Sequence, residues 1–106
     1  MTYEQYAGFL SNLTDKLADV DTDLPIHEQH IALLKARLAG GKYTYLKILD
    51  GTSVEYVKVS DQGGKLFLER GLELTTPTTF PIGSCVKWEI TPSAIRDIIC
   101  QMPCCP

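Results

Sequence analysis

The sequence predicts an α+β protein with an N-terminal helical hairpin, a small antiparallel β domain and a short C-terminal helix. Three observations lead to this fold class. Apolar residues recur at helical spacing through the first 20 residues, they alternate with polar residues from residue 42 onward, and Thr91-Pro92 is typical of a helix start. We therefore expect a hairpin over residues 1–41 that serves oligomerisation or attachment. A β module over residues 42–106 follows and ends in a C-terminal helix and a cysteine-rich tail.

The first expected helix covers residues 3–20. Thr2 is placed to cap it, with Gln5 at the third helical position of a capping box. Its apolar residues follow alternating spacings of three and four, as in a heptad seam: Tyr3, Tyr6, Leu10, Leu13, Leu17 and Val20. Such a seam either packs against its own domain or joins copies of the chain in a short bundle. The second interpretation places the four residues from Tyr6 to Leu17 in a subunit interface.

A second helix is expected from Pro25 to Ala39, because proline suits a first helical turn and two glycines follow the C-terminal end. His27 and His30 are three residues apart and therefore share one side of this helix. Zinc needs at least one further ligand, and the HExxH pattern of zinc enzymes spaces its histidines four residues apart. We interpret the pair as solvated or interface histidines.

The β domain is predicted from alternating strands over residues 42–49, 54–59, 65–70 and 85–90, with Asp-Gly and Gly-Gly turns between the first three. Both faces of these strands carry apolar or aromatic side chains. Such a sheet is buried on two sides or gives one face to a partner. We expect the interface anchors to be aromatic: Tyr43, Tyr45, Tyr56 and Trp88. A final helix is predicted from Pro92 to about Ile99, capped by Thr91.

The composition argues against two classes of protein. The net charge is −3, so no basic excess exists to neutralise phosphates, and nucleic acid is not an expected partner. The sequence has no run of about 18 apolar residues, so no membrane span is expected. The first ten residues lack the basic and apolar regions of a secretory signal, which predicts synthesis and folding in the cytosol.

The segment from Asp50 to Val86 has a recognisable order of turns and strands. It contains Asp-Gly-Thr, Gly-Gly-Lys-Leu, Arg-Gly-Leu-Glu, Thr-Thr and Phe-Pro-x-Gly-Ser-x-Val. This order resembles a small β module of tail fibre and baseplate proteins of tailed bacteriophages. The matching positions are Leu66, Leu68, Arg70, Gly71, Glu73, Thr75, Phe80, Gly83, Ser84 and Val86. The match covers about 40 of the 106 residues, and it departs at Leu74, where the family usually has glycine.

The resemblance implies a virion structural protein, a minor tail protein of the tail tip, baseplate or fibre-attachment region. It implies assembly in the host cytoplasm and a final location in the virion tail. The expected partners are other phage tail and baseplate proteins and further copies of the chain, often in threes. A receptor- or carbohydrate-binding module is an alternative, for which exposed aromatic residues near the threonine-rich loop would be the sign.

The motif itself predicts a fixed corner and no reaction. Arg70 leaves a strand just before Gly71, with Glu73 close by, so an arginine–carboxylate pair is expected to hold this corner, unless the two form only a solvated surface pair. Gly71 and Gly83 bracket the loop and allow the chain to bend at both ends. Nothing in the sequence places a nucleophile, a base and an oxyanion donor together, so we do not expect an enzyme.

The cysteines are the remaining chemical candidates: Cys85, Cys100, Cys104 and Cys105. Four thiolates can hold zinc or an iron–sulfur cluster, and a metal-binding adaptor is therefore a second alternative. The spacing does not follow a standard motif, and adjacent cysteines rarely bind one ion together. Disulfides to other subunits and free thiols are the other two interpretations, and no cofactor is the main expectation.

Overall fold

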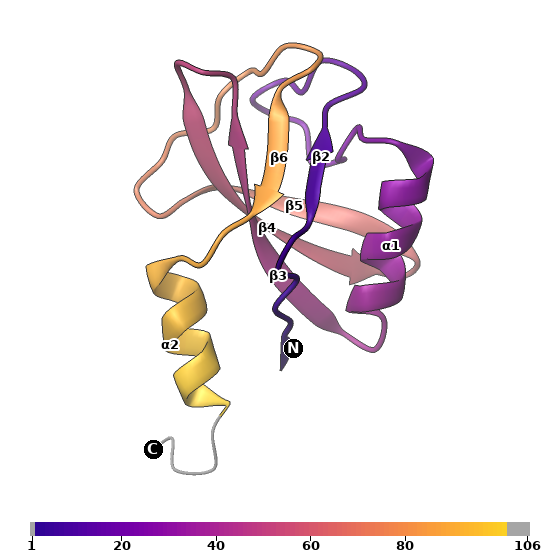
Figure 1. Cartoon of the computed structure of the whole chain (residues 1–106), viewed down its shortest axis with the longest axis vertical. Helices are drawn as coiled ribbons and strands as arrows, with labels where there is room; N and C mark the ends of the chain where they lie inside the picture. Colours follow the sequence, from indigo (N-terminus) through magenta and orange to yellow (C-terminus); the bar gives the residue numbers. More distant parts are fainter. Residues whose placement is uncertain (1, 102–106) are drawn as a thin grey trace.

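The computed structural model describes residues 2–101, which form six strands and two helices. In chain order they are β1 (Thr2–Tyr3), β2 (Leu10–Asn12), α1 (Glu28–Leu38), β3 (Lys42–Leu49), β4 (Val54–Gln62), β5 (Lys65–Leu72), β6 (Cys85–Trp88) and α2 (Pro92–Cys100). All six strands belong to one sheet in the order β2-β6-β3-β4-β5, with β1 beside the start of β3 (Figure 1). Only the β1–β3 pair is parallel among these strands.

The predicted N-terminal helical hairpin is wrong, because the first helix begins at Glu28 and residues 2–20 are extended or turned. Gly8 has a φ of +87°, a conformation that interrupts a helix, and the segment is rich in Asn, Thr and Asp, which favour turns over helix interiors. From Phe9 to Leu13 every second side chain is buried, which is the period of a strand. The heptad-like spacing therefore belongs to a strand and two loops, and Thr2 lies in β1 instead of capping a helix.

The elements after residue 41 agree well with the prediction. β3 has the predicted bounds, whereas β4 and β5 each continue beyond the expected end and β6 stops at Trp88. The last helix begins at Pro92, and the Thr91 hydroxyl accepts a hydrogen bond from the Ala94 N–H, as expected of a cap. The second predicted helix exists as α1 but begins three residues late, since the Pro25 carbonyl is bound to Thr14.

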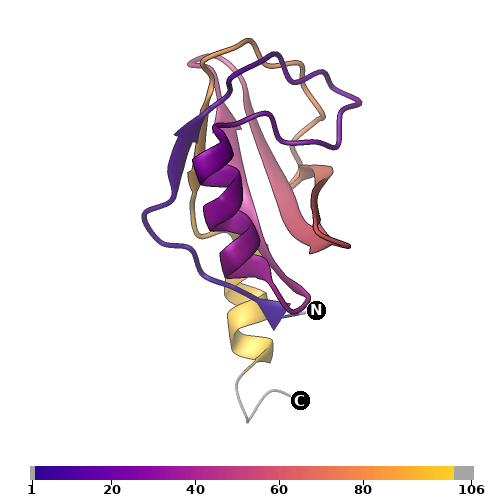
Figure 2. The same ribbon diagram turned by 90° about the vertical axis from the view of Figure 1, so that its right-hand side faces the viewer.

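One hydrophobic core joins the N-terminal segment to the β module. α1 lies against one face of the curled sheet, with Leu34 and Leu38 completely buried (Figure 2). Phe9, Leu13 and Leu17 enter the same cluster as the inward side chains of β3–β6. The residues on both sides of position 41 therefore pack together and pair in one sheet.

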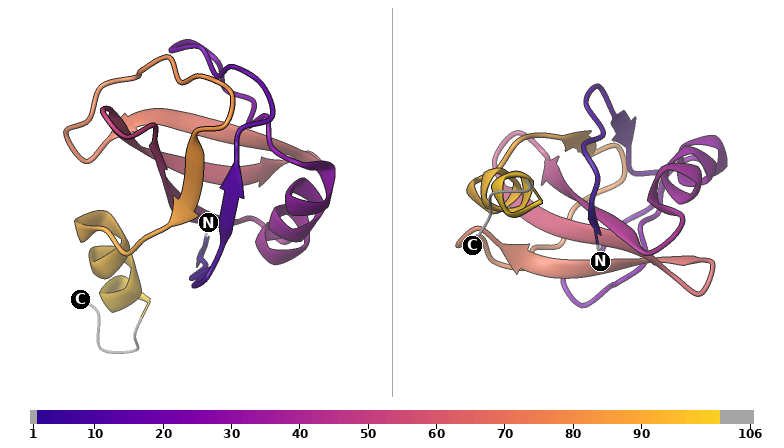
Figure 3. Two further views of the ribbon diagram at one scale, coloured as in Figure 1. Left: turned by 45° about the horizontal axis from the view of Figure 1, so that its top comes forward. Right: turned by 90° about the horizontal axis from the view of Figure 1, so that it is seen from below.

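The loop after β2 crosses to the opposite edge of the sheet, where it contacts β5. Leu17 and Phe80 form an isolated antiparallel bridge, and the N–H of Leu68 in β5 donates to the Thr22 carbonyl at 2.8 Å. β5 is the last strand in the sheet order, so this bond brings the β2–α1 loop to its outer edge (Figure 3). These backbone hydrogen bonds help to position the connecting segment, which we define as residues 71–84 and which runs from the last two residues of β5 to the start of β6.

Candidate functional site

A buried ion pair holds the start of the connecting segment. Arg70, near the end of β5, binds Glu55 of β4 with two parallel hydrogen bonds, Nε to Oε2 at 2.7 Å and Nη2 to Oε1 at 2.9 Å. Its remaining three N–H groups donate to the backbone carbonyls of Ala18, Asp21 and Thr78 at 2.7–2.8 Å. All five guanidinium donors are therefore used. The pair joins β4 and β5 to two loops.

Glu55 is the acceptor at the centre of this network. Its side chain is fully buried, and its oxygens also accept from the N–H groups of Gly71 and Thr78 at 2.9 and 2.8 Å. An arginine–carboxylate pair therefore holds this corner, but the expected pairing of Arg70 with Glu73 is wrong, because the acid is Glu55. Glu55 shares the inward face of its strand with Val57 and Val59, and a buried acid needs a partner. The sequence did not show which face is inward, because Val54 and Tyr56 make the other face apolar too.

The turn after Gly71 depends on left-handed backbone at three positions, Gly71, Glu73 and Leu74. Gly71 has a φ of +68°, and a Cβ there would lie 2.7 Å from Cδ of Pro77, so the site excludes other residues. Glu73 and Leu74 follow with φ of +55° and +63°. The left-handed conformation at position 74 is the one that glycine adopts without strain. Leu74 makes the same turn under strain, with its side chain fully exposed.

The other matched residues also have structural tasks. Leu66, Leu68, Phe80 and Val86 are core residues. The Thr75 hydroxyl accepts from the N–H of Tyr56 and donates to the Leu72 carbonyl. The Glu73 carboxylate accepts from the N–H of Ser93 at 3.2 Å, the Ser84 hydroxyl donates to Pro81, and Gly83 turns the chain with a φ of +92°. The ten matching residues therefore have structural roles in the fold.

The predicted interface residues lie mostly inside the chain's own fold. Leu13, Leu17, Tyr43 and Tyr45 are buried, and Tyr6, Tyr56 and Trp88 are partly buried; Leu10 is exposed. Tyr6 lies against Arg37, whose guanidinium is 4.6 Å from the ring centre. The role of these eight residues in an interface stays a prediction.

Two of these tyrosines anchor α2 to the sheet. The hydroxyls of Tyr43 and Tyr45 both donate to Oδ2 of Asp97, at 2.5 and 2.7 Å. Burial, together with this acceptor, raises the pKa of Tyr43 to about 12 and also raises the pKa of Tyr45. Burial acts against ionisation of Asp97, but the hydrogen bonds from the tyrosines and Arg96 outweigh it and lower the pKa of Asp97. Gln101 adds a pair of hydrogen bonds to the backbone of Tyr3.

The two described cysteines lie far apart and carry no disulfide. Cys85 begins β6 and pairs with Leu49 at the end of β3, whereas Cys100 ends α2, which packs near the start of β3. From Tyr45 to Leu49, β3 spans on the order of 13 Å, so the two thiols do not share an ion here. Within residues 2–101 no three metal-ligating side chains come together. Cys104 and Cys105 lie outside the described residues.

The histidine pair is next to a buried serine. The rings of His27 and His30 are 5.6 Å apart, and Nδ1 of His30 lies 2.6 Å from the Ser11 hydroxyl oxygen. Sequence reasoning missed this contact because it placed Ser11 on a helix. Ser11 is 3% exposed, so a substrate does not reach its oxygen. We interpret the contact as satisfying a buried hydroxyl.

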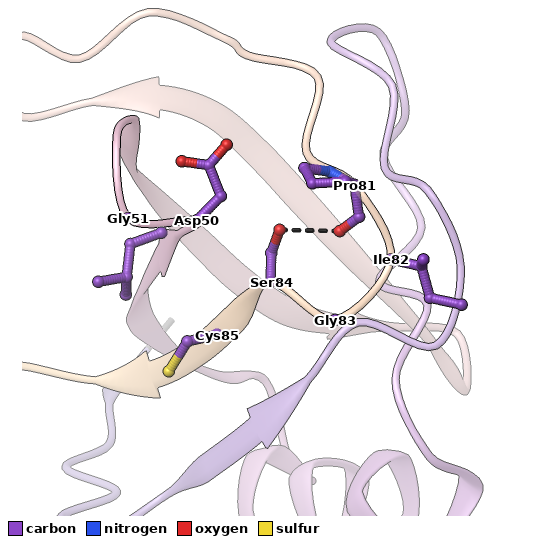
Figure 4. A pocket seen from close by; sticks show the side chains of 8 residues that line it. Asp50, Gly51, Pro81, Ile82, Gly83, Ser84 and Cys85 are labelled. Carbon is purple, nitrogen blue, oxygen red and sulfur yellow. Dashed lines mark hydrogen bonds between the residues drawn. The ribbon is translucent and has the colours of Figure 1, made fainter.

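A pocket of about 370 Å³ lies between the β3–β4 turn and the end of the connecting segment (Figure 4). Its polar groups are already engaged. Asp50 accepts from the N–H groups of Ser53 and Thr52, which lower its pKa, and the Ser84 hydroxyl donates to Pro81. Cys85 is half-buried at the wall, with no histidine among the lining residues. The pocket therefore lacks an activated nucleophile.

Comparison with known proteins adds no family to these observations. No protein-family model matches the chain, and no curated protein matches it in sequence. Neither helix among the described residues is long and apolar enough to cross a membrane.

Proposed function

We propose that the chain is a virion structural protein of the tail tip, baseplate or fibre-attachment region of a tailed bacteriophage, and that it acts by assembly. One observation carries the proposal: all ten residues of the phage-like phrase serve the scaffold around the connecting segment. Four are core residues, and Arg70 joins two loops through a buried network. Residues that serve the fold in this way are typical of a structural module.

The chemistry of the described residues supports a binding role as well. The Ser11 hydroxyl in the Ser11–His30 contact is buried, and the polar side chains of the pocket at the β3–β4 turn are bound to neighbouring backbone. Exposed apolar side chains are instead present on α2 and in the connecting segment. Where such residues form a contiguous patch, the patch marks a surface that contacts other proteins.

Particles produced by the strain that encodes the chain provide the test. We expect peptides of the chain in the mass spectrum of purified virions, and antibodies against it to label the tail end in electron micrographs. Deletion of the gene is expected to give particles with incomplete tails. Virions that lack the protein, together with normal tails after the deletion, would refute the proposal.

A further inference from the structure

The C-terminal end of the described chain presents an apolar surface. Ile95 and Ile99 are four residues apart on α2 and are about half exposed, at 47% and 52%. They share the outward face of the helix, while Ala94 and Ile98 face the tyrosines of β1 and β3. Ile90, just before the helix, is 50% exposed. α2 lies at one end of the molecule, beside the sheet and away from α1 (Figures 1 and 3).

Leu74 lies close to the first turn of this helix. The carboxylate of the preceding residue, Glu73, binds the N–H of Ser93 in the first turn of α2. Leu74 therefore lies within about 12 Å of that turn, given the length of one residue and one glutamate side chain. Its side chain is fully exposed although its φ of +63° strains the backbone. Strain at an exposed apolar residue points to a function outside the folded chain. We call Leu74, Ile90, Ile95 and Ile99 the apolar patch.

The helix that carries most of the patch is already ordered. A nine-residue helix is unstable alone in water. Here Asp97 binds two tyrosine hydroxyls, and Gln101 binds both backbone groups of Tyr3. A partner therefore meets a preformed surface and does not have to order the helix, which lowers the entropic cost of association.

The size of the patch fits a particular interface. With about 200 Å² for a fully exposed Leu or Ile, the four side chains present on the order of 500 Å² of apolar surface. A standard interface buries about 800 Å² on each partner, of which about 60% is apolar. The patch thus supplies the apolar share of one side of a standard interface.

The charges around the patch allow a second copy of this chain to approach. The chain has a net charge of −3, so two copies repel weakly over most orientations. At the patch, Asp97 is paired with Arg96 at 3.2 Å, and Glu73 is bound to Ser93. Two copies can therefore approach here with their acidic groups compensated.

We propose that the apolar patch is a twofold interface between two copies of this chain. α2 of one copy packs against α2 of the other through Ile95 and Ile99, and Leu74 and Ile90 close the sides. The same patch faces itself, so the assembly ends at two copies. This inference rests on the proposed role in assembly and names the surface that carries it.

Sedimentation equilibrium of the full 106-residue chain tests the proposal, with a reductant present so that cysteine oxidation does not link copies. We expect a monomer–dimer equilibrium. The variant Ile95→Glu with Ile99→Glu is expected to raise the dissociation constant on the order of 100-fold or more, because it buries charges in the centre of the interface. Leu33→Glu is the matched control: Leu33 is 51% exposed on α1, outside the patch, and its variant should associate as the wild type does.

Hydrogen exchange of the unsubstituted chain gives a second readout that does not depend on how the variants fold. We expect slower exchange in α2 and around Leu74 at high than at low concentration. A chain that stays monomeric at high concentration would overturn the proposal. A trimer, or a dimer that the double substitution leaves intact, would overturn it too. Tail labelling in virions combined with a monomeric chain would leave the proposed function in place and remove only this interface.

Discussion

Replacing Arg70 by methionine tests the centre of the scaffold. The substitution keeps a long apolar stem and removes five donors, which leaves the fully buried Glu55 carboxylate with only two backbone N–H partners. It also removes the donors to three backbone carbonyls. Breaking a buried ion pair on one side costs about 3–5 kcal/mol. A domain of this length has a total stability of about 5–15 kcal/mol, so we expect the variant to remain mostly folded in water but to lose a large share of its free energy of unfolding.

Urea denaturation followed by circular dichroism measures this loss. Arg37→Met is the matched control, since Arg37 binds Glu4 at 2.6 Å but its side chain is 46% exposed. Exposed pairs contribute about 0–1 kcal/mol, so the control should stay close to the wild type. A loss below about 1 kcal/mol in Arg70→Met, or equal losses in both variants, would refute the view that burial makes this pair essential.

A double variant separates the charge from the geometry. Glu55→Gln with Arg70→Met removes the uncompensated charge, and we expect it to recover about 1–2 kcal/mol relative to Arg70→Met alone. Full recovery is not expected, because the carbonyls of Ala18, Asp21 and Thr78 remain without the arginine donors. Wild-type stability of the double variant would show that these three hydrogen bonds contribute nothing.

Three further predictions concern the turn and α2. Gly71→Ala should lower the free energy of unfolding by about 2–4 kcal/mol, because the added Cβ would clash with Pro77 and the positive φ is unfavourable for alanine. Gly51→Ala has a positive φ but open space around it, so it should cost only about 1 kcal/mol in the same urea denaturation. Leu74→Gly should stabilise the monomer by about 0.5–1 kcal/mol, since relief of left-handed strain exceeds the added chain entropy; a loss of stability would contradict the strain. The raised pKa of Tyr43 favours the neutral phenol in the folded state, so its contribution is complete below about pH 10 and is lost as the pH rises through about 12. Tyr43→Phe should weaken the alkaline loss of stability between these values in a pH series of thermal melts, and an unchanged alkaline profile would contradict the assignment.

The strands after residue 41 could be predicted because their signals are local. Asp50-Gly51 marks a turn, and alternation on either side fixes the faces, so β3 has its predicted bounds. The helix predicted for the N-terminal segment was wrong for a physical reason. The apolar residues of this segment satisfy a helical spacing, while Phe9, Ser11 and Leu13 alternate as in a strand. The sheet decides between them, because β2 pairs with β6, about 75 residues further along the chain. Local spacing carries no information on that pairing.

The acid that pairs with Arg70 could not be predicted either, because it depends on strand pairing between distant parts of the chain. Glu73 is closer in sequence, but Glu55 reaches the guanidinium only through the register of β4 against β5, which shifts between Tyr56 and Lys58. A bulge of this kind re-aims the side chains around it. Glu55 alternates with Val57 and Val59, but Val54 and Tyr56 make the other face of the strand apolar as well, so neither the burial of Glu55 nor the identity of its partner could be predicted from the sequence.

The same network connects the scaffold to the apolar patch. Arg70 fixes the Thr78 carbonyl while Glu55 fixes the N–H of Gly71, so both ends of the turn that contains Leu74 are held by one ion pair. A hydrophobic pair of similar volume would fill the space, but it would leave these backbone groups without partners. The ion pair therefore sets where Leu74 projects. On this argument, a variant that loosens the pair should weaken association through the patch even where the core stays folded.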